Sequence, residues 1–263
     1  MDRGFGVTGT LDTGIVRELA PLLESLGYRT LWINDVPEGD SLARCAAAID
    51  VTARLRVATG VIPIDRRGPQ DIVADVVRRG IPADRLTIGV GSGMAPHALD
   101  RVRSAVADLR RLADPSTSIS VGALGPKMTA LAATVSDDVL LNWLTPAAAR
   151  VSSTEVREVA VNAGRPTPRV TAYVRVATAP EAIDRLVSEA ERYGAYPSYA
   201  AHFRRFGVEP VDTTIGSTDA ATVVRRLKTY TGTVDEIVVR AITAAETFES
   251  YRDLALLTAP EGS

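Results

Sequence analysis

Residues 122–127, with the sequence GALGPK, combine glycines, a proline and a lysine in a pattern that suits a bound anion. Glycine lets a backbone turn tightly and approach a ligand, and proline suits the first position of a helix because its missing N–H would be unpaired there. The free N–H groups of a first helical turn favour an anion, and the lysine adds a mobile cation. The segment therefore predicts a phosphate site, with a tight loop beside a solvated lysine as the alternative. The predicted site consists of Gly122, Ala123, Leu124, Gly125, Pro126 and Lys127.

A second glycine turn, formed by Gly91, Ser92 and Gly93, is followed a few residues later by His97. The turn is a candidate for cofactor binding, and a simple break between strand and loop is the alternative. His97 is a candidate for general acid–base catalysis because histidine titrates near neutral pH. The other histidine, His202, lies far away in the sequence, and we expect it to be structural or solvated.

Other catalytic patterns are missing from the sequence. No E-x-x-H or H-x-E pattern surrounds either histidine, so no metal site is expected. No G-x-S-x-G motif indicates hydrolase chemistry. The single cysteine, Cys45, shares an apolar helical stripe with Leu42 and Ile49, which predicts an inert core thiol and excludes an intrachain disulfide.

The composition excludes several kinds of partner. Thirty basic and thirty-two acidic side chains give a net charge of -2, so the chain lacks the basic stripe of a nucleic-acid binder. No stretch approaches the roughly 20 apolar residues of a membrane span, and the first residues contain no apolar segment of signal-peptide length. We therefore expect a cytoplasmic protein with a small-molecule organic substrate and no nucleic-acid or membrane partner.

The elements that must position these residues are short apolar runs alternating with longer segments of helical periodicity. The runs are rich in Val, Ile, Leu and Thr, as strands buried on both faces should be. The predicted strands are residues 4–8, 30–34, 55–62, 86–90, 118–123, 138–143, 169–177 and 234–241. The predicted helices are residues 13–27, 41–54, 70–79, 99–112, 127–135, 153–163, 180–192 and 219–229. Expected helix caps are Asp12, Ser152 and Ser217 at amino ends and Gly27 and Gly80 at carboxyl ends.

Strict alternation of eight strands with eight helices predicts a parallel sheet with right-handed crossovers. The chain length of 263 residues is close to the roughly 250 typical of one (β/α)8 barrel. An open doubly wound sheet is the alternative, but no G-x-G-x-x-G opens the first helix. We therefore predict an α/β protein with one domain, a (β/α)8 TIM barrel over residues 1–263. Residues 193–214 are expected as a partly helical excursion over the barrel mouth, residues 244–257 as a closing helix, and residues 258–263 as a disordered tail.

Enzymes with this architecture carry their site at the carboxyl ends of the strands. Asn142, at one such end, could hydrogen-bond a ring or a substrate, and Trp143 could stack on an apolar face; strand-end packing is the alternative for both. Arg66 and Arg67 follow the third strand and could hold an acidic tail of a cofactor, with a solvated charge run as the alternative. The other strand-end candidates are Gly9, Asn34, Asp35, Thr59, Gly60, Val61, Arg175 and Arg240.

Six segments together resemble the luciferase-like monooxygenases, in order and spacing, over nearly the whole chain. The resemblance implies a luciferase-like barrel, a homodimer, and a reduced flavin or its 5-deaza analogue, coenzyme F-420, in the barrel mouth. The Ala- and Arg-rich composition is typical of actinobacteria, which favours coenzyme F-420, with FMN as the alternative. The segments are GYRTLWIND (27–35), RLRVATGVIPIDRRGP (54–69), DRLTIGVGSG (84–93), GALGPKM (122–128), DDVLLNW (137–143) and STDAATVVRRLKTYTGTVDEIVVRAI (217–242).

The resemblance also implies roles for single residues. Asp35 matches an acidic position near the redox ring and is the candidate proton donor or hydrogen-bond anchor, with Asn34 beside it among the cofactor-binding residues. Thr59, Gly60 and Val61 match a bulge that backs the ring, where relatives often have a cis peptide bond. The matching bond here is Gly60–Val61. The loop at residues 122–127 matches the segment that receives the cofactor phosphate.

Three positions depart from the family pattern. Val36 stands where many relatives have a histidine directly after the acid, which puts luciferase-type oxygen chemistry in doubt. Met94 stands where the deazaflavin-dependent sugar-phosphate dehydrogenases have a glutamate, and His97 stands where they have an asparagine. That sugar-phosphate activity is therefore not supported.

The working hypothesis is an oxidoreductase that transfers a hydride between coenzyme F-420, or a reduced flavin, and an organic substrate. Asp35, His97 and Asn142 are its catalytic candidates. A non-catalytic flavin or deazaflavin carrier or sensor is one alternative. The other is a phosphate-binding barrel isomerase or aldolase without a redox cofactor, in which Gly216 and Ser217 before the last barrel helix would form the phosphate site.

Overall fold

Eight parallel strands close into one barrel in the computed structural model, which describes residues 1–94 and 96–260. The barrel strands are β1 (Asp2–Thr8), β2 (Thr30–Asn34), β3 (Arg56–Thr59) continued by β4 (Ile62–Pro63), β5 (Leu86–Gly91), β6 (Ser118–Ala123), β7 (Asp138–Asn142), β8 (Arg169–Ala177) and β10 (Glu236–Ala241). The last strand, β10, pairs in parallel with both β1 and β8, and this closes the sheet. A two-residue strand, β9 (Ile215–Gly216), pairs with the end of β8. The predicted fold class is confirmed.

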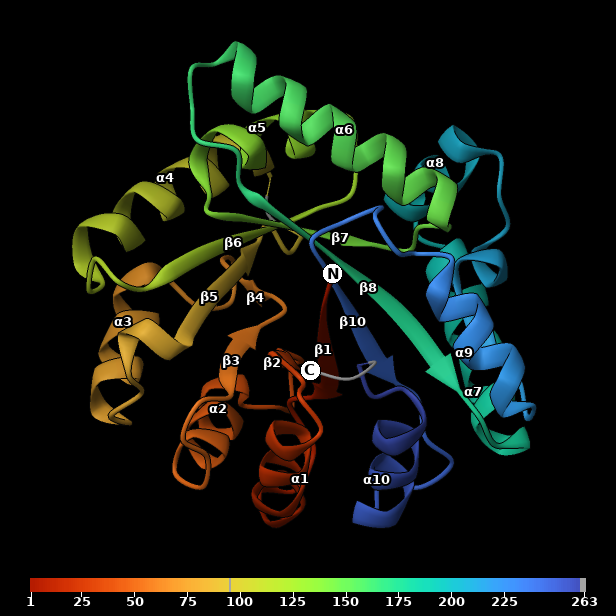
Figure 1. Cartoon of the computed structure of the whole chain (residues 1–263). Coiled ribbons are helices and arrows are strands. Elements are labelled where there is room, and N and C mark those ends of the chain that lie inside the picture. The colour runs from red at the N-terminus through yellow and green to blue at the C-terminus, as the bar shows by residue number, and fades with distance from the viewer. Residues whose placement is uncertain (95, 261–263) are drawn as a thin grey trace.

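Helices surround the central strands, as Figure 1 shows. Eight of them correspond to the predicted helices, α8 forms the helical part of the excursion at residues 193–214, and α10 is the closing helix. Their bounds are α1 (Thr13–Ser25), α2 (Ser41–Ile49), α3 (Pro69–Arg78), α4 (Ala98–Leu112), α5 (Pro126–Val135), α6 (Pro146–Asn162), α7 (Pro180–Gly194), α8 (Pro197–Phe206), α9 (Ala220–Lys228) and α10 (Phe248–Leu257), with short 3-10 helices at Ala83–Arg85 and Pro210–Thr213.

The two largest clusters of the apolar core lie on opposite sides of the sheet because alternate strand residues face opposite sides. The larger cluster lies between strands and helices, where Val7 and Ile33 from strands are buried together with Leu19 and Leu42 from helices. Cys45 is fully buried in this cluster, and burial raises the pKa of its thiol, which confirms the prediction of an inert cysteine. The smaller cluster fills the inside of the barrel and consists of Trp32, Ala58, Leu140, Tyr173 and Val238.

The third barrel strand contains a bulge. Ala58 is paired with Thr87 of β5, but Ile62 is paired with Val90 of the same strand, so one strand spans four residues where the other spans three. An extra residue on one side of a pairing is the definition of a β-bulge. The bulge separates β3 from β4, so the predicted single strand at residues 55–62 is divided. The Gly60–Val61 peptide bond within it is cis, as the resemblance implied.

Three helices differ from their predicted bounds by four residues or more. The closing helix predicted at residues 244–257 begins at Phe248, after the N-cap Thr247. The predicted helix at residues 41–54 ends at Ile49, and the following loop is held by Glu24, whose carboxylate accepts hydrogen bonds from the N–H groups of residues 53–55. The predicted helix at residues 153–163 begins earlier, at Pro146, after the N-cap Thr145. Ser152 and Ser153 therefore lie inside this helix and are buried, which makes the predicted cap at Ser152 wrong.

Of the remaining predictions for helix caps and for the carboxyl-terminal segment, some are confirmed and some are wrong. Asp12 caps α1 as predicted, whereas Asp219 rather than Ser217 caps α9. Gly27 and Gly80 both have the positive φ expected of residues that follow a helix. Thr258, where the disordered tail was predicted to begin, is 1% exposed and donates to Leu254 O, so this prediction is wrong at its first residue. Residues 261–263 lie outside the described part of the chain.

Candidate active site

The bulge residue Val61 lies at the carboxyl end of the barrel strands, on top of the apolar layer that fills the barrel. Its side chain is flanked by glycines of the next two strands. A β-carbon on Gly91 would lie 2.6 Å from one Val61 methyl group, and one on Gly122 would lie 3.1 Å from the other. Larger residues at these two positions would occupy the space around Val61. The two glycine segments singled out in the sequence therefore meet at one apolar surface, which we call the Val61 floor (Val61, Gly91 and Gly122).

Two buried polar atoms beside this floor have no hydrogen-bond partner among the described residues. The Asn34 amide donates to Gly60 O at 2.9 Å, but its Oδ1 has no donor. The Tyr173 hydroxyl is also buried without a partner, next to Gly60, and burial raises the pKa of this phenol. A buried polar atom without a partner costs free energy, so an acceptor and a hydroxyl left unpaired at one site fit a ligand that supplies the missing partners.

Tyr173 was not singled out in the sequence, although a signal for it existed. It lies two positions before Arg175 on β8, and residues two apart on a strand face the same side. Because Arg175 was expected at the mouth, the same face had to carry Tyr173 one layer deeper.

Asp35 lies at the end of β2 and is held by two side chains of this chain. Arg66 forms an ion pair with it, and Ser41 donates a hydrogen bond of 2.5 Å to its Oδ2. The Asp35 side chain is only 6% exposed. The neighbouring Arg67 is paired with Asp75, which is also buried. Both arginines proposed for an acidic cofactor tail are thus paired with carboxylates of this chain.

The GALGPK segment opens α5, as predicted. Its N-cap residue, Gly125, provides no side-chain cap, and Pro126 occupies the first helical position. A β-carbon on Gly125 would meet nothing within 4 Å, so the space beside this residue is open. Lys127 is exposed at the same place. The segment has the free donors, the space and the cation that a phosphate requires.

The helix α8 is tied to this segment by His202. One ring nitrogen of His202 lies 2.9 Å from Leu124 O and the other lies 2.9 Å from Trp143 O. The residue is 5% exposed, and burial lowers the pKa of its imidazole. His202 therefore links the excursion to the loops that follow β6 and β7, which agrees with its predicted structural role.

Asn142 and Trp143 both contact Arg175 of β8. Arg175 donates to Asn142 Oδ1 at 2.7 Å, and its guanidinium lies 3.6 Å from the centre of the Trp143 ring. Trp143 is 1% exposed and packs against Tyr193 and Phe203 from the excursion side. Its ring faces are therefore occupied by protein, which favours the packing alternative over stacking on a cofactor.

The structure does not bring His97 to the other candidates. It is exposed, has a positive φ of 54° and makes no capping bond at the start of α4. The turn before it is organised by Asp65, which accepts from Met94 N at 2.8 Å and lies where a β-carbon on Gly93 would be. Ser92 makes only a long bond to its neighbour, at 3.3 Å.

A cavity of about 500 Å³ opens beside the ends of β1 and β10. Of the strand-end candidates, only Arg240 lines it. Most of the other lining residues come from α7 and the chain after β10, and sequence reasoning missed them. Their signal was the spacing of Arg185, Glu189 and Arg192, which places three charges on one face of a helix. We call this space the β10 cavity; its lining includes Thr8, Arg185, Glu189, Arg192, Arg240 and Tyr251.

Comparison with known proteins agrees with the fold and with the resemblance seen in the sequence. The model of the family described as luciferase-like monooxygenase matches residues 100–253, more than half of the chain. The chain therefore belongs to the luciferase-like monooxygenase family, a family of flavin- and F-420-dependent oxidoreductases. No curated protein matches it.

Solved structures of similar fold cover nearly the whole chain. The coenzyme F-420-dependent tetrahydromethanopterin reductase from Methanopyrus kandleri has a TM-score of 0.74 at 16% identity, over 98% of this chain and 97% of that chain. An F-420-dependent secondary alcohol dehydrogenase in complex with an F-420–acetone adduct has a TM-score of 0.76 at 14% identity, over 98% and 99%. The FMN complex of the oxygenating constituent of 3,6-diketocamphane monooxygenase from Pseudomonas putida has a TM-score of 0.69 at 16% identity, over 99% and 98%.

Proposed function

We propose that this protein is an oxidoreductase that transfers a hydride between coenzyme F-420 and a small organic substrate, with reduced FMN as the alternative cofactor. The observation that carries the proposal is the Val61 floor, where glycines of two strands clear the space around one apolar side chain and two buried polar atoms lack partners. Such a surface fits a flat ring with polar edges. The cofactor, when bound, supplies or accepts the hydride, and the protein contributes binding and orientation.

The chain's residues would divide this work between the floor and the loop. Val61 would support one face of the ring, and Asn34 Oδ1 and the Tyr173 hydroxyl would offer it an acceptor and a donor. The open N–H groups at the start of α5, with Lys127, would bind the cofactor phosphate. Asp35 would serve as a hydrogen-bond anchor, because a proton-donor role would first require Arg66 to move away.

The preference for coenzyme F-420 is supported by Val36. Many relatives have histidine there, and its absence weakens the case for oxygen chemistry, which a deazaflavin disfavours. Two of the similar folds described above belong to F-420-dependent enzymes. We also expect a homodimer on the basis of the family.

A phosphate-binding isomerase is less well supported. Its phosphate site would lie at the start of α9, but that helix is capped by Asp219, whose carboxylate accepts from the N–H groups of Ala221 and Thr222. A carboxylate at the N-terminus occupies the donors that a phosphate would need and repels it. The start of α5, with no side-chain cap, differs in this respect.

The test measures equilibrium binding of the purified protein to coenzyme F-420 and to FMN. Fluorescence quenching reports the binding. We expect a dissociation constant below about 100 µM for at least one of them, which corresponds to roughly 5.5 kcal/mol. Tighter binding of F-420 supports the first choice and tighter binding of FMN the second. Binding of neither contradicts the proposal. Reduced cofactor that no organic acceptor reoxidises would favour the non-catalytic carrier or sensor.

A further inference from the structure

Arg240 is the second-last residue of β10, and its side chain lies across the barrel mouth next to β1. A β-carbon on Gly6 of β1 would lie 3.4 Å from Arg240 Cδ and 3.3 Å from its Cα. Glycine at this position therefore leaves the space that the arginine side chain uses. The side chain is partly buried and lines the β10 cavity.

The guanidinium of Arg240 has no carboxylate partner among the described residues. Its one hydrogen bond runs from Nη1 to Ala241 O at 2.5 Å, which leaves most of its donors without a protein acceptor. The neighbouring inward arginine, Arg175, is paired, since it donates to Glu189 at 2.7 Å and to Asn142 at 2.7 Å. Two arginines and one partly buried glutamate thus leave a net charge of +1 at this end of the barrel.

The other charged residues around the β10 cavity do not neutralise this net positive charge, because they lie nearer the solvent than Arg240 does. Asp184 and Glu246 line the cavity but are exposed to solvent, where water screens them. Arg185 is exposed and donates to the carbonyls of Thr243 and Ala244. Among the described residues that line the cavity, Arg240 is the one arginine that is partly buried and forms no ion pair with a carboxylate.

We infer that Arg240 binds a carboxylate of the substrate, so that the substrate of this enzyme is a small organic acid. That the bound acid is a substrate rests on the proposed function. That Arg240 binds an anion rests on the geometry alone. A guanidinium presents parallel N–H donors that match the two oxygens of a carboxylate. The cavity volume of about 500 Å³ is in the range of small-molecule sites.

The experiment compares carboxylic acids with their uncharged amides of the same shape. Binding of acetate, butyrate and benzoate, and of acetamide, butyramide and benzamide, is measured by calorimetry at pH 7.5, with and without saturating FMN. We expect at least one acid to bind tenfold or more tightly than its amide, a difference of about 1.4 kcal/mol. Arg240→Met, which keeps the length of the apolar stem, should abolish this preference, and Arg240→Lys should retain part of it.

A matched control comes from outside the cavity. Arg103 is exposed on α4 and does not line the β10 cavity, so Arg103→Met should leave the preference for acids unchanged. No preference for acids in the unmodified protein, or a preference that survives Arg240→Met, overturns the inference. Thermal unfolding of each variant separates loss of binding from loss of folding.

A second comparison distinguishes the source of the anion. The phosphate of a cofactor could also bind Arg240. The affinities for FMN and for riboflavin, which lacks the phosphate, are therefore measured for the unmodified protein and for Arg240→Met. Equal effects of Arg240→Met on the two, or no effect, support a substrate carboxylate. A loss confined to FMN overturns the inference by assigning the arginine to the cofactor. If FMN, riboflavin and F-420 all fail to bind, the proposed function is contradicted. The comparison of acids with amides still tests the anion site in that case.

Discussion

At the scale of single residues, the site depends on the absence of side chains as much as on their presence. Val61 can lie at the carboxyl end of the barrel because its neighbours on β5 and β6 are glycines. The same residues were selected in the sequence as a glycine turn and a phosphate loop. Their shared contact with Val61 gives them a second purpose, which is to shape the Val61 floor.

We predict that Gly91→Ala weakens cofactor binding tenfold or more, because the added methyl group would lie 2.6 Å from a Val61 methyl group and displace it. Binding of FMN or F-420 by fluorescence quenching measures the effect. Gly68→Ala is the matched control, since its methyl group would lie no closer than 3.9 Å to the nearest side chain and Gly68 lies outside the predicted cofactor site, so the affinity should change less than threefold. The double variant with Val61→Ala should recover part of the loss; equal losses in the single and double variants would show that the Val61 contact is not the cause.

A second residue-scale prediction concerns Asp35. Its replacement by alanine removes the partner of Arg66 and the hydrogen bond from Ser41. We expect turnover of the first substrate found by screening to fall at least tenfold, while the dissociation constant of the cofactor changes less than threefold. Asp71, an exposed acid in the first turn of α3, is the control for loss of one negative charge. Unchanged turnover in Asp35→Ala would remove Asp35 from the mechanism.

At the scale of elements, α8 joins parts of the site that the barrel alone leaves separate. Its His202 contacts carbonyls that follow β6 and β7, and a carbonyl can only accept a hydrogen bond. A neutral imidazole has one N–H and can donate to only one of them. The buried His202 side chain therefore links α8 to the loops that follow β6 and β7.

We predict that His202→Ala lowers the free energy of unfolding by about 1–3 kcal/mol, because it leaves a cavity and removes a donor from buried carbonyls. It should also weaken binding of FMN more than binding of riboflavin, since Leu124 belongs to the predicted phosphate loop. Chemical denaturation and flavin titration measure the two effects. His97→Ala is the stability control because His97 is exposed and makes no capping bond. Equal losses for FMN and riboflavin would mean that His202 does not position the phosphate loop.

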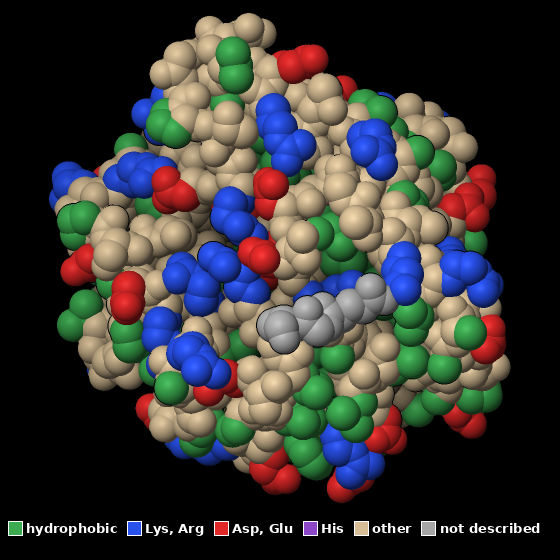
Figure 2. Space-filling view, viewed as in Figure 1, with side chains coloured by type: hydrophobic (Ala, Val, Ile, Leu, Met, Phe, Trp, Pro, Cys, Tyr) green, Lys and Arg blue, Asp and Glu red, His purple; other side chains and the backbone are tan. Residues whose placement is uncertain are grey.

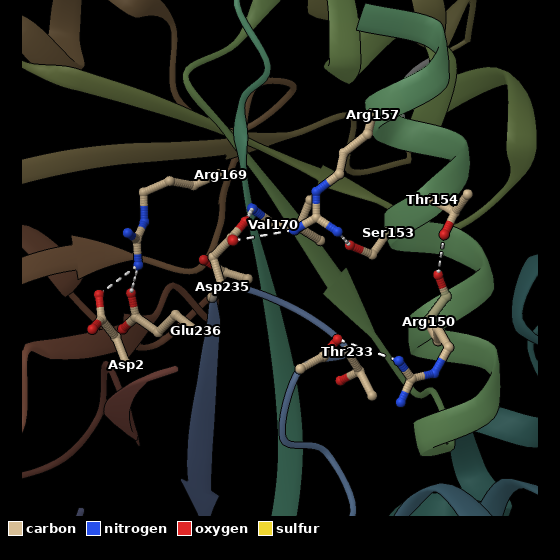
Figure 3. A network of polar contacts seen from close by, with 12 residues as sticks. Asp2, Arg150, Ser153, Thr154, Arg157, Arg169, Val170, Thr233, Asp235 and Glu236 are labelled. Carbon is tan, nitrogen blue, oxygen red and sulfur yellow. Dashed lines mark hydrogen bonds and ion pairs between the residues drawn. The ribbon is translucent and has the colours of Figure 1, made fainter.

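At the scale of the whole molecule, the two ends of the barrel differ in how their charges are used. At the amino end, Arg169 bridges Asp2 and Glu236, and Arg157 joins Asp235 to Ser153, as Figure 3 shows. On the face seen in Figure 2, basic side chains gather left of the centre with acidic side chains beside them. Arg169 and Arg157 are thus paired with carboxylates of the protein, in contrast to Arg240 at the other end. Within the described residues, no helix is both long and apolar enough to cross a membrane.

Two carboxyl groups at the amino end make the stability depend on pH. Burial raises the pKa of Asp138 to about 6 and that of Glu236 to about 7. The folded protein therefore holds protons that the unfolded chain has already released, so the free energy of unfolding falls as the pH rises from about 4 to about 7.

We predict that Glu236→Gln raises the free energy of unfolding at pH 8 by about 1–3 kcal/mol and flattens its fall between pH 5 and 7. The amide oxygen can still accept the hydrogen bond from Trp32 Nε1. Urea denaturation at several pH values measures the effect. Glu18→Gln, at an exposed position on α1, should leave the curve unchanged. A variant that is less stable than the parent at pH 8 would show that the pairing with Arg169 outweighs the cost of burying the charge.

The sequence by itself determined the barrel, the order of its elements and most of the residues at its mouth. Hydrophobic periodicity and glycine or proline signals act over a few residues, so they can be interpreted without knowing the neighbours in space. The loop that opens α5 was predictable for this reason, whereas the bulge at Gly60 was implied only by the resemblance. The end of α2 was not, because it is held by Glu24 from a different helix.

Only the tertiary structure decided which side chains face each other. The charge run after the third strand gave no indication that Arg66 would pair with Asp35 and Arg67 with Asp75. Similarly, Trp143 and Arg240 were equivalent strand-end candidates in the sequence, yet one is packed under α8 and the other lines a cavity and has no carboxylate partner among the described residues. Burial and ion pairing depend on contacts between segments distant in the chain, and local pattern carries no information about them.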